Sequence, residues 1–180
     1  MRDLRAVLLP LLTTVLGFLP ACASPPLDPD DPTLLARPFT AAQIAAAMPA
    51  GRVIELEQSQ PMGKGRLRWT VVEADDDGCV IEYAPLDADG APVGEARRVR
   101  HGWTELRDHA SFPVETSTVE DDRRLTPLGL VDGRTYTTTD AESGTVTRMF
   151  FSPMFPGPPL WFETTRGRQL VQTMQQTARR

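Results

Sequence analysis

The sequence predicts a mainly β protein: a curved antiparallel sheet or open barrel of about nine strands, with two short helices. Apolar and polar residues alternate over much of the chain, as at residues 67–71, and a period of two is typical of a half-buried strand. Asp-Gly turn signals separate these stretches, for example at residues 77–78 and 89–90. No long crossover connections intervene, so successive strands are expected to pair as antiparallel hairpins.

A short helix is expected where the globular part begins. Thr40 and Gln43 have the spacing of a capping box, and Phe39 and Ile44 can form a hydrophobic staple around it. The alanines that follow favour helix, and Pro49 ends it.

The rest of the globular sequence is assigned to strands, turns and one further helix. That helix covers residues 103–110, with Thr104 as its N-cap. The strand at residues 93–100 is polar and is therefore expected at a sheet edge. The expected strands cover residues 54–56, 67–71, 79–83, 93–100, 114–125, 134–139, 145–151, 160–164 and 169–177. Further turns are expected at residues 132–133, 143–144 and 166–167, and a rigid proline-rich loop at residues 153–159.

This order of elements over residues 39–180 resembles the open-barrel fold of periplasmic lipoprotein carriers of the LolA/LolB type. The resemblance covers the order of elements and no specific motif, so it transfers no binding residues. A sheet of this size usually curls, closes or is covered, and the N-terminal helix is well placed to cover one face. The 142 residues of this part are a typical length for a single domain.

The chain starts with the pattern of an export signal. Two arginines, Arg2 and Arg5, precede an apolar run at residues 6–19. A membrane-spanning helix needs roughly 20 apolar residues, so this run is too short to span a bilayer. The run ends in Leu19-Pro20-Ala21-Cys22, which resembles the lipobox of a bacterial lipoprotein signal peptide.

The resemblance implies that residues 1–21 are removed and that the thiol of Cys22 receives a diacylglyceryl group. Two or three acyl chains on Cys22 would hold the protein on a membrane, whereas one chain anchors only marginally. Ala23 follows the cysteine in place of aspartate, which implies the outer membrane, facing the periplasm. Residues 22–38 then form a lipidated cysteine and a proline-rich tether, which could reach roughly 50 Å, and residues 39–180 the domain.

An ordinary secretory signal is the alternative. Ala21-Cys22-Ala23 also has the A-x-A pattern of a signal-peptidase site, and Pro20 departs from the usual lipobox. Cleavage after Ala23 would discard the cysteine and give a secreted or soluble periplasmic protein. We prefer the lipoprotein interpretation because a cysteine directly follows a leucine-rich run and a small residue.

The composition excludes some partners. Without residues 1–21 the net charge is −6, and an acidic chain lacks the basic surface that nucleic acid requires. If Cys22 is lipidated, Cys79 is the sole remaining cysteine, and its apolar neighbours favour a buried, inert thiol.

The sequence shows no motif for catalysis, metal binding or a cofactor. It has no G-x-S-x-G, no H-E-x-x-H and no phosphate-binding loop. The aspartates at residues 75–77 and 87–89 lack the distal glutamate of a calcium loop and are expected to form turns. His109 lies near Asp108 and Ser111, so a hydrolase remains an alternative, but we expect a protein that is not an enzyme and holds no metal or cofactor.

An apolar cluster at residues 149–162 is the strongest remaining feature. Phe150, Phe155, Trp161 and Phe162 are candidate ligand-binding residues, because exposed aromatic patches mark binding sites and a curved sheet so lined could hold an acyl chain. A two-sided core is the alternative, since neighbouring residues of one strand point to opposite faces.

Three functions are therefore compared. The preferred one is a non-enzymatic, lipid-anchored cell-envelope protein that binds a lipid or other apolar ligand. The second is a structural or interaction lipoprotein that meets an envelope protein through an edge strand or through the polar strand at residues 169–177. The third is a hydrolase that uses His109.

Overall fold

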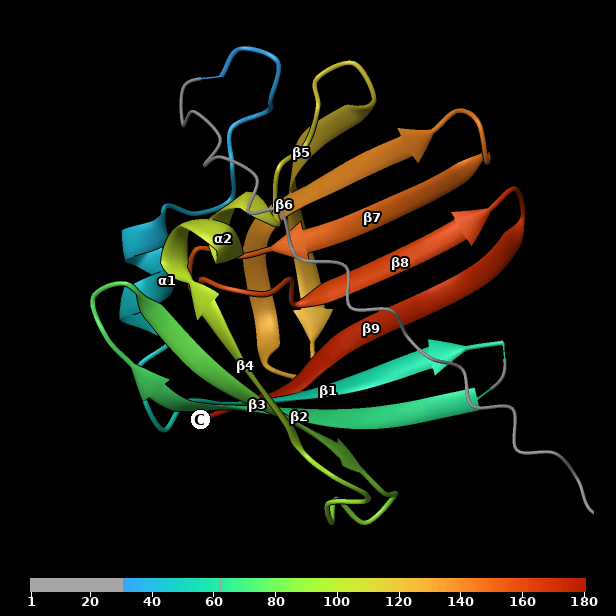
Figure 1. Ribbon diagram of the computed structural model, residues 1–180. Helices are drawn as coiled ribbons and strands as arrows, with labels where there is room; N and C mark the ends of the chain where they lie inside the picture. Colours follow the sequence, from blue (N-terminus) through green and yellow to red (C-terminus); the bar gives the residue numbers. More distant parts are fainter. Residues whose placement is uncertain (1–30, 62) are drawn as a thin grey trace, which may run out of the picture.

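A computed structural model describes residues 31–61 and 63–180, which form one open, nine-stranded antiparallel sheet and two short helices (Figure 1). The predicted fold class is confirmed. The strands are β1 (Val53–Gln60), β2 (Gly63–Ala74), β3 (Gly78–Leu86), β4 (Arg97–Gly102), β5 (Ser117–Thr126), β6 (Gly129–Asp140), β7 (Thr145–Phe151), β8 (Trp161–Arg166) and β9 (Gln169–Arg179). The helices are α1 (Ala41–Ala47) and α2 (Trp103–Asp108).

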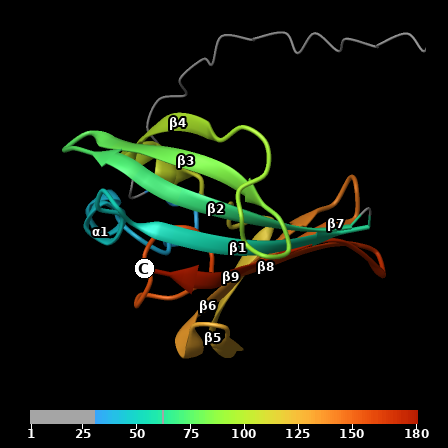
Figure 2. The same cartoon turned by 90° about the horizontal axis from the view of Figure 1, so that it is seen from below.

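The sheet is built from two runs of hairpins joined in the middle. Its order is β4-β3-β2-β1-β9-β8-β7-β6-β5, so the first and last strands of the chain pair with each other. Figure 2 shows this succession from β4 on one side to β5 on the other. Within residues 31–61 and 63–180, the two free edges are therefore β4, as predicted from its polar sequence, and β5, which follows it in the chain after α2.

Helix α1 forms as the sequence predicts. The Thr40 hydroxyl accepts a hydrogen bond from the Gln43 amide at 3.2 Å, and the Gln43 side chain accepts one from the Thr40 amide at 2.8 Å. This reciprocal capping box satisfies two amides that the helix leaves without partners. Phe39 and Ile44, the predicted staple pair, are both buried in the main core.

Helix α2 begins at Trp103 as predicted and ends at Asp108, but its N-cap is Gly102 and not Thr104. The Glu105 carboxylate accepts a hydrogen bond from the Gly102 amide at 3.2 Å and so fulfils the capping role from inside the helix. The indole N–H of buried Trp103 donates to the carbonyl of Asp75 at 2.9 Å, which fixes the first helical residue against the β2–β3 turn.

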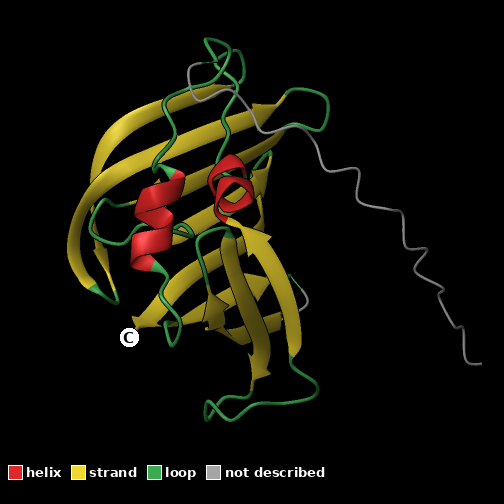
Figure 3. Ribbon diagram, turned by 60° about the vertical axis from the view of Figure 1, so that its left-hand side comes forward, coloured by secondary structure: helices red, strands yellow, loops and turns green. Residues whose placement is uncertain are grey.

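Both helices lie on the hollow side of the curved sheet (Figure 3). They contact each other and cover one end of this concave face. The main core is formed there by buried apolar side chains of both helices and of the concave face, among them Ile44, Met48, Ile54, Leu56, Ile81, Trp103, Tyr136 and Phe151.

One predicted turn is wrong. Residues 132–133 lie inside β6, and the chain instead turns at residues 126–129, where Gly129 has a φ of 112°. Gly133 serves packing: a Cβ atom there would lie 2.1 Å from the Phe151 carbonyl oxygen and 2.8 Å from the Phe150 ring. An Asp-Gly pair can thus occur inside a strand, where close packing requires the glycine, as well as in a turn.

Residues 31–38, the described part of the predicted tether, contact the domain. The Leu35 amide donates to the Phe112 carbonyl at 2.8 Å, and the Ala36 carbonyl accepts a hydrogen bond from the Tyr136 hydroxyl at 2.8 Å. Within the described residues, no helix is long and apolar enough to span a membrane.

Substituting Gly133→Ala should destabilise the fold by about 1–3 kcal/mol, because the added methyl group overpacks the contact with β7. Thermal or urea unfolding of the variant measures this loss. Gly65→Ala is the matched control, since that strand glycine has no atom within 4 Å of its Cβ position. Equal stability of the two variants would contradict the packing role of Gly133.

Candidate functional site

A cavity of about 170 Å³ lies between the two helices and the concave face. Its walls are almost entirely apolar. Alternating residues of the strands form the floor, and residues one helical turn apart form the cover. The lining consists of Ile44 and Met48 from α1, Leu106, His109 and Ala110 at α2, Trp69, Ile81, Met149 and Phe151 from the sheet, and Gly157, Pro158 and Pro159 from the proline-rich loop.

Trp69, which lines this cavity, carries a buried polar atom without a hydrogen-bond partner in the part of the chain that the structure describes. Its Nε1 atom is buried, yet no acceptor for it lies among the described residues. The ring is held by an edge-on contact with Tyr83, with 5.3 Å between the ring centres. A buried indole N–H usually finds a hydrogen-bond partner, so this unpaired group is unfavourable.

Arg179 fixes the proline-rich loop that borders the cavity. Its guanidinium donates to the carbonyls of Phe155 at 3.1 Å and Pro156 at 2.6 Å, and more weakly to Ala47 at the end of α1 at 3.4 Å. Burial, with a smaller effect of nearby Arg52, lowers the pKa of Arg179 to about 10. One side chain thus joins the sheet, the loop and α1.

A chain of polar side chains attaches α2 to the sheet at the rim of the cavity. Tyr83 Oη and His101 Nε2 are 2.8 Å apart, and His101 Nδ1 lies 3.2 Å from Glu105. His109 Nε2 approaches the same carboxylate at 3.8 Å. His109 itself is largely exposed.

The side chains considered for a hydrolase are engaged elsewhere. Asp108 contacts Arg107 at 2.7 Å and Arg37 at 3.5 Å. The Ser111 hydroxyl accepts a hydrogen bond from Arg37 at 3.3 Å, while His109 faces Glu105. Over residues 31–61 and 63–180, no three histidine, cysteine, aspartate or glutamate side chains are grouped to hold a metal ion. The aspartates predicted to form turns do so: Asp75 accepts hydrogen bonds from two amides of its own turn.

The four predicted ligand-binding aromatics are not brought together. Phe150 and Trp161 face each other on the convex side of the sheet, whereas Phe162 pairs with Met149 on the concave side. Phe150 is fully buried with Val131 and Leu160 in a second, smaller core, against which Phe155 and Trp161 pack. None of the four lines the cavity. Their role as ligand-binding residues stays a prediction, and Cys22 lies outside the described residues.

The residues that do line the cavity had a signal in the sequence. Ile44 and Met48, and likewise Leu106 and Ala110, are four residues apart and so share a helix face. Trp69 belongs to the strand alternation described above. What the sequence did not reveal is which strand face these helix faces cover.

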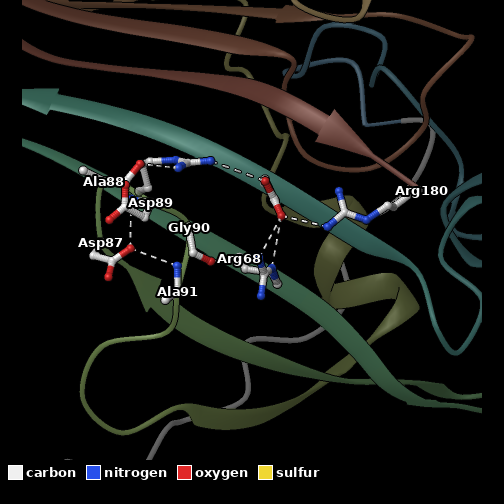
Figure 4. Close-up of polar contacts among 9 residues, drawn as sticks. Arg68, Asp87, Ala88, Asp89, Gly90, Ala91 and Arg180 are labelled. Carbon is white, nitrogen blue, oxygen red and sulfur yellow. Dashed lines mark hydrogen bonds and ion pairs between the residues drawn. The ribbon is translucent and has the colours of Figure 1, made fainter.

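A charged cluster lies on the opposite, convex face (Figure 4). The Glu55 carboxylate, on β1, accepts hydrogen bonds from Arg68 at 3.0 Å and from Arg180 at 2.9 Å, and Arg66 lies 3.6 Å away. Arg66 and Arg68 also donate to carbonyls of the loop after β3, at Ala88 and Gly90. The cluster therefore ties β2, that loop and the end of β9 to β1.

Cys79 is buried on β3 and has a free thiol. Burial raises its pKa to about 11, so the protonated, unreactive thiol prevails at neutral pH. The position agrees with the buried thiol that the sequence predicted.

Neither known family profiles nor curated proteins match this sequence. Among solved structures the chain is similar to MucB, with 12% identity and a TM-score of 0.52 over 77% of this chain and 56% of that one. It is also similar to the MucA/MucB complex of Pseudomonas aeruginosa, with 12% identity and a TM-score of 0.50 over 77% of this chain and 54% of that one. An exported protein of Bacteroides fragilis, provisionally so named and with a YmcC-like fold, gives 10% identity and a TM-score of 0.44 over 72% and 95%.

These similarities concern the fold. MucB has a LolA-like fold, so the resemblance in element order that the sequence showed extends to three dimensions. The chain spans about half the length of MucB, as the 56% coverage shows.

Substituting Glu55→Gln should lower the melting temperature at pH 7 by removing the negative charge that pairs with Arg180 and Arg68. The hydrogen bond from Arg180, opposed by burial and assisted by Arg68, lowers the pKa of Glu55 below its ordinary value of 4.5. Its stabilisation is therefore complete above pH 4.5 and disappears as the pH falls through the lowered value. Melting curves from pH 7 to pH 2 should converge for the two proteins. Glu57→Gln, exposed on the same strand, is the control, and a gap that persists at pH 2 would contradict the assignment.

Proposed function

We propose that this protein is a non-enzymatic, lipid-anchored protein of the bacterial cell envelope that holds an apolar part of a ligand between its helices and its sheet. The observation that carries the proposal is the cavity itself. It is lined mainly by apolar side chains from α1, α2 and three strands of the sheet, and it lies where the concave face would otherwise pack solidly against the helices.

The chemistry of the lining indicates the class of ligand. Met48, Leu106 and Met149 offer flexible or branched apolar contacts, and methionine adapts well to varied apolar shapes. The buried indole N–H of Trp69 calls for one hydrogen-bond acceptor. An aliphatic chain that carries an ester or amide carbonyl combines both properties, as lipids and acylated peptides do.

The size of the cavity limits what it holds in this conformation. Pockets for whole small molecules commonly measure about 300–1,000 Å³, and this one measures about 170 Å³. It therefore accommodates a short aliphatic segment, and a longer chain requires α1 and α2 to move away from the concave face. Such a movement breaks contacts that hold the helices to the sheet, among them the hydrogen bonds from Trp103 to Asp75 and from Arg179 to Ala47.

The place in the cell follows from the N-terminal sequence. The lipobox-like Leu19-Pro20-Ala21-Cys22 supports lipidation of Cys22 and attachment to the outer membrane, facing the periplasm. Cleavage after Ala23 remains the alternative and would leave a soluble periplasmic protein with the same cavity.

An interaction protein is the second candidate, supported by the similarity to MucB, which has been solved as a complex with MucA. The surface first considered for a partner cannot serve as an edge, because β9 is an interior strand paired with β1 and β8 along its two sides. The edge strands of the described sheet, β4 and β5, are the available alternatives. Affinity capture after cross-linking in the envelope tests this candidate, and recovery of no specific protein would count against it.

Native mass spectrometry of residues 24–180, exported to a periplasm and purified without detergent, tests the proposal. We expect a reproducible additional mass of lipid size on the unmodified protein. Ala110→Phe fills the cavity and should abolish that mass, whereas Ala46→Phe places the same group on the exposed side of α1 and should retain it. A protein without bound mass, or loss in both variants alike, would contradict binding in this cavity.

A further inference from the structure

The two free edges of the sheet differ in a way that bears on self-association. An edge strand presents unpaired amides and carbonyls, and proteins usually protect such edges with charge. Edge β4 does so with Arg97, Arg98 and Arg100, which would face like charges in a second β4. Both edges also carry ion pairs within the chain: Arg98 with Glu82 at 2.8 Å and Arg100 with Asp75 at 2.7 Å on β4, and Arg123 with Asp132 at 3.2 Å and Asp121 with Arg134 at 3.3 Å on β5.

Edge β5 carries both signs of charge in an order that can match itself. Residues 119–125 read Val-Glu-Asp-Asp-Arg-Arg-Leu. Acidic residues fill the first half and basic residues the second, with one exposed apolar residue at each end, Val119 (38% exposed) and Leu125 (84% exposed). An antiparallel copy of this segment reverses the order, so that acidic residues meet basic ones.

We infer that β5 pairs with β5 of a second copy of this chain, in an antiparallel arrangement whose two-fold axis passes through Asp122. In this register Asp121 faces Arg123 of the other copy, and Glu120 faces Arg124. Val119 faces Leu125, so the two exposed apolar side chains cover each other. Symmetry doubles each of these contacts, as in any isologous interface.

The backbone of β5 is in the correct phase for this pairing. The Thr116 carbonyl accepts a hydrogen bond from Thr139 at 2.9 Å, so even-numbered residues of β5 point their backbone groups toward β6. Odd-numbered residues of an antiparallel strand then point theirs outward. The proposed register pairs these outward-pointing residues with each other, 121 with 123 and 119 with 125, so that their backbone groups can form hydrogen bonds. The corresponding faces of the two sheets then become continuous.

Other registers lose these contacts. A shift of two residues in one direction sets Arg123 against its own copy and Asp121 against Leu125. A shift in the other direction sets Glu120 against Asp122. The proposed register has one like-charged contact, Asp122 with Asp122, and that carboxylate already accepts hydrogen bonds from Thr135 at 2.6 Å and Arg124 at 2.7 Å.

Disulfide trapping of the full chain, exported to an oxidising periplasm, tests the inference. Asp122→Cys places two thiols opposite each other across the axis, in a non-hydrogen-bonded pair about 4.5 Å apart at Cα, a distance that a disulfide spans. We expect a dimer on a non-reducing gel. The control Thr118→Cys lies on the same face of the same strand, but its two thiols would be eight residues apart along the strand. No disulfide should form, and this variant should run as a monomer on the same gel.

Charge reversal adds a measurement that needs no cysteine. Glu120→Arg places an arginine opposite Arg124 of the other copy in both symmetric contacts. It should raise the dissociation constant of the dimer about tenfold, as measured by sedimentation of the intact protein in density-matched detergent. Glu142→Arg makes the same change in the β6–β7 turn and should leave the constant unaltered. Sedimentation of the unmodified protein as a monomer throughout the concentration series would overturn the inference, as would equal cross-linking of Asp122→Cys and Thr118→Cys.

Discussion

The pairing of β1 with β9 is the constraint on which the rest of the structure depends. It joins two runs of hairpins that the chain makes at opposite ends, and it places the free edges at β4 and β5. The Val53 amide and carbonyl both bond to Arg180, and on the convex side the Glu55 carboxylate accepts a hydrogen bond from the Arg180 side chain. Without this join each half would be a smaller sheet with one more exposed edge and no shared concave face.

The proposed ligand site and the proposed interface both follow from that arrangement. Because the free edges belong to β4 and β5, the connection between them, α2, lies over the hollow side of the sheet, beside α1. Two short helices cannot fill a concave face of nine strands as closely as another sheet would, and a cavity of about 170 Å³ remains. The same topology leaves β5, ten residues long, without a neighbouring strand on its outer side among the residues that the structure describes.

Local signals predicted much of this fold. The alternation of Leu67 and Trp69, the Thr40 capping box and the proline-rich loop each specify their own structure, and the number of strands and helices followed from them. The pairing of β1 with β9 had no local signal, because it joins residues more than a hundred positions apart. For the same reason the sequence indicated that neighbouring aromatics point to opposite faces but not what covers each face: Phe150 fills the space above Gly133 on the convex face, and Phe162 lies on the other.

Amide hydrogen exchange, resolved by residue, tests the central role of the β1–β9 pairing most directly. If this pairing holds the two halves together, the amides of Glu57 and Gln175, which face each other across the join, open only with global unfolding and are among the slowest to exchange, while the hairpin tips exchange early. Exchange of these two amides as fast as those of the free edge β4 would contradict the account, because the two halves would then separate without unfolding. The concave face, its cavity and the placement of α2 would then not depend on the β1–β9 pairing.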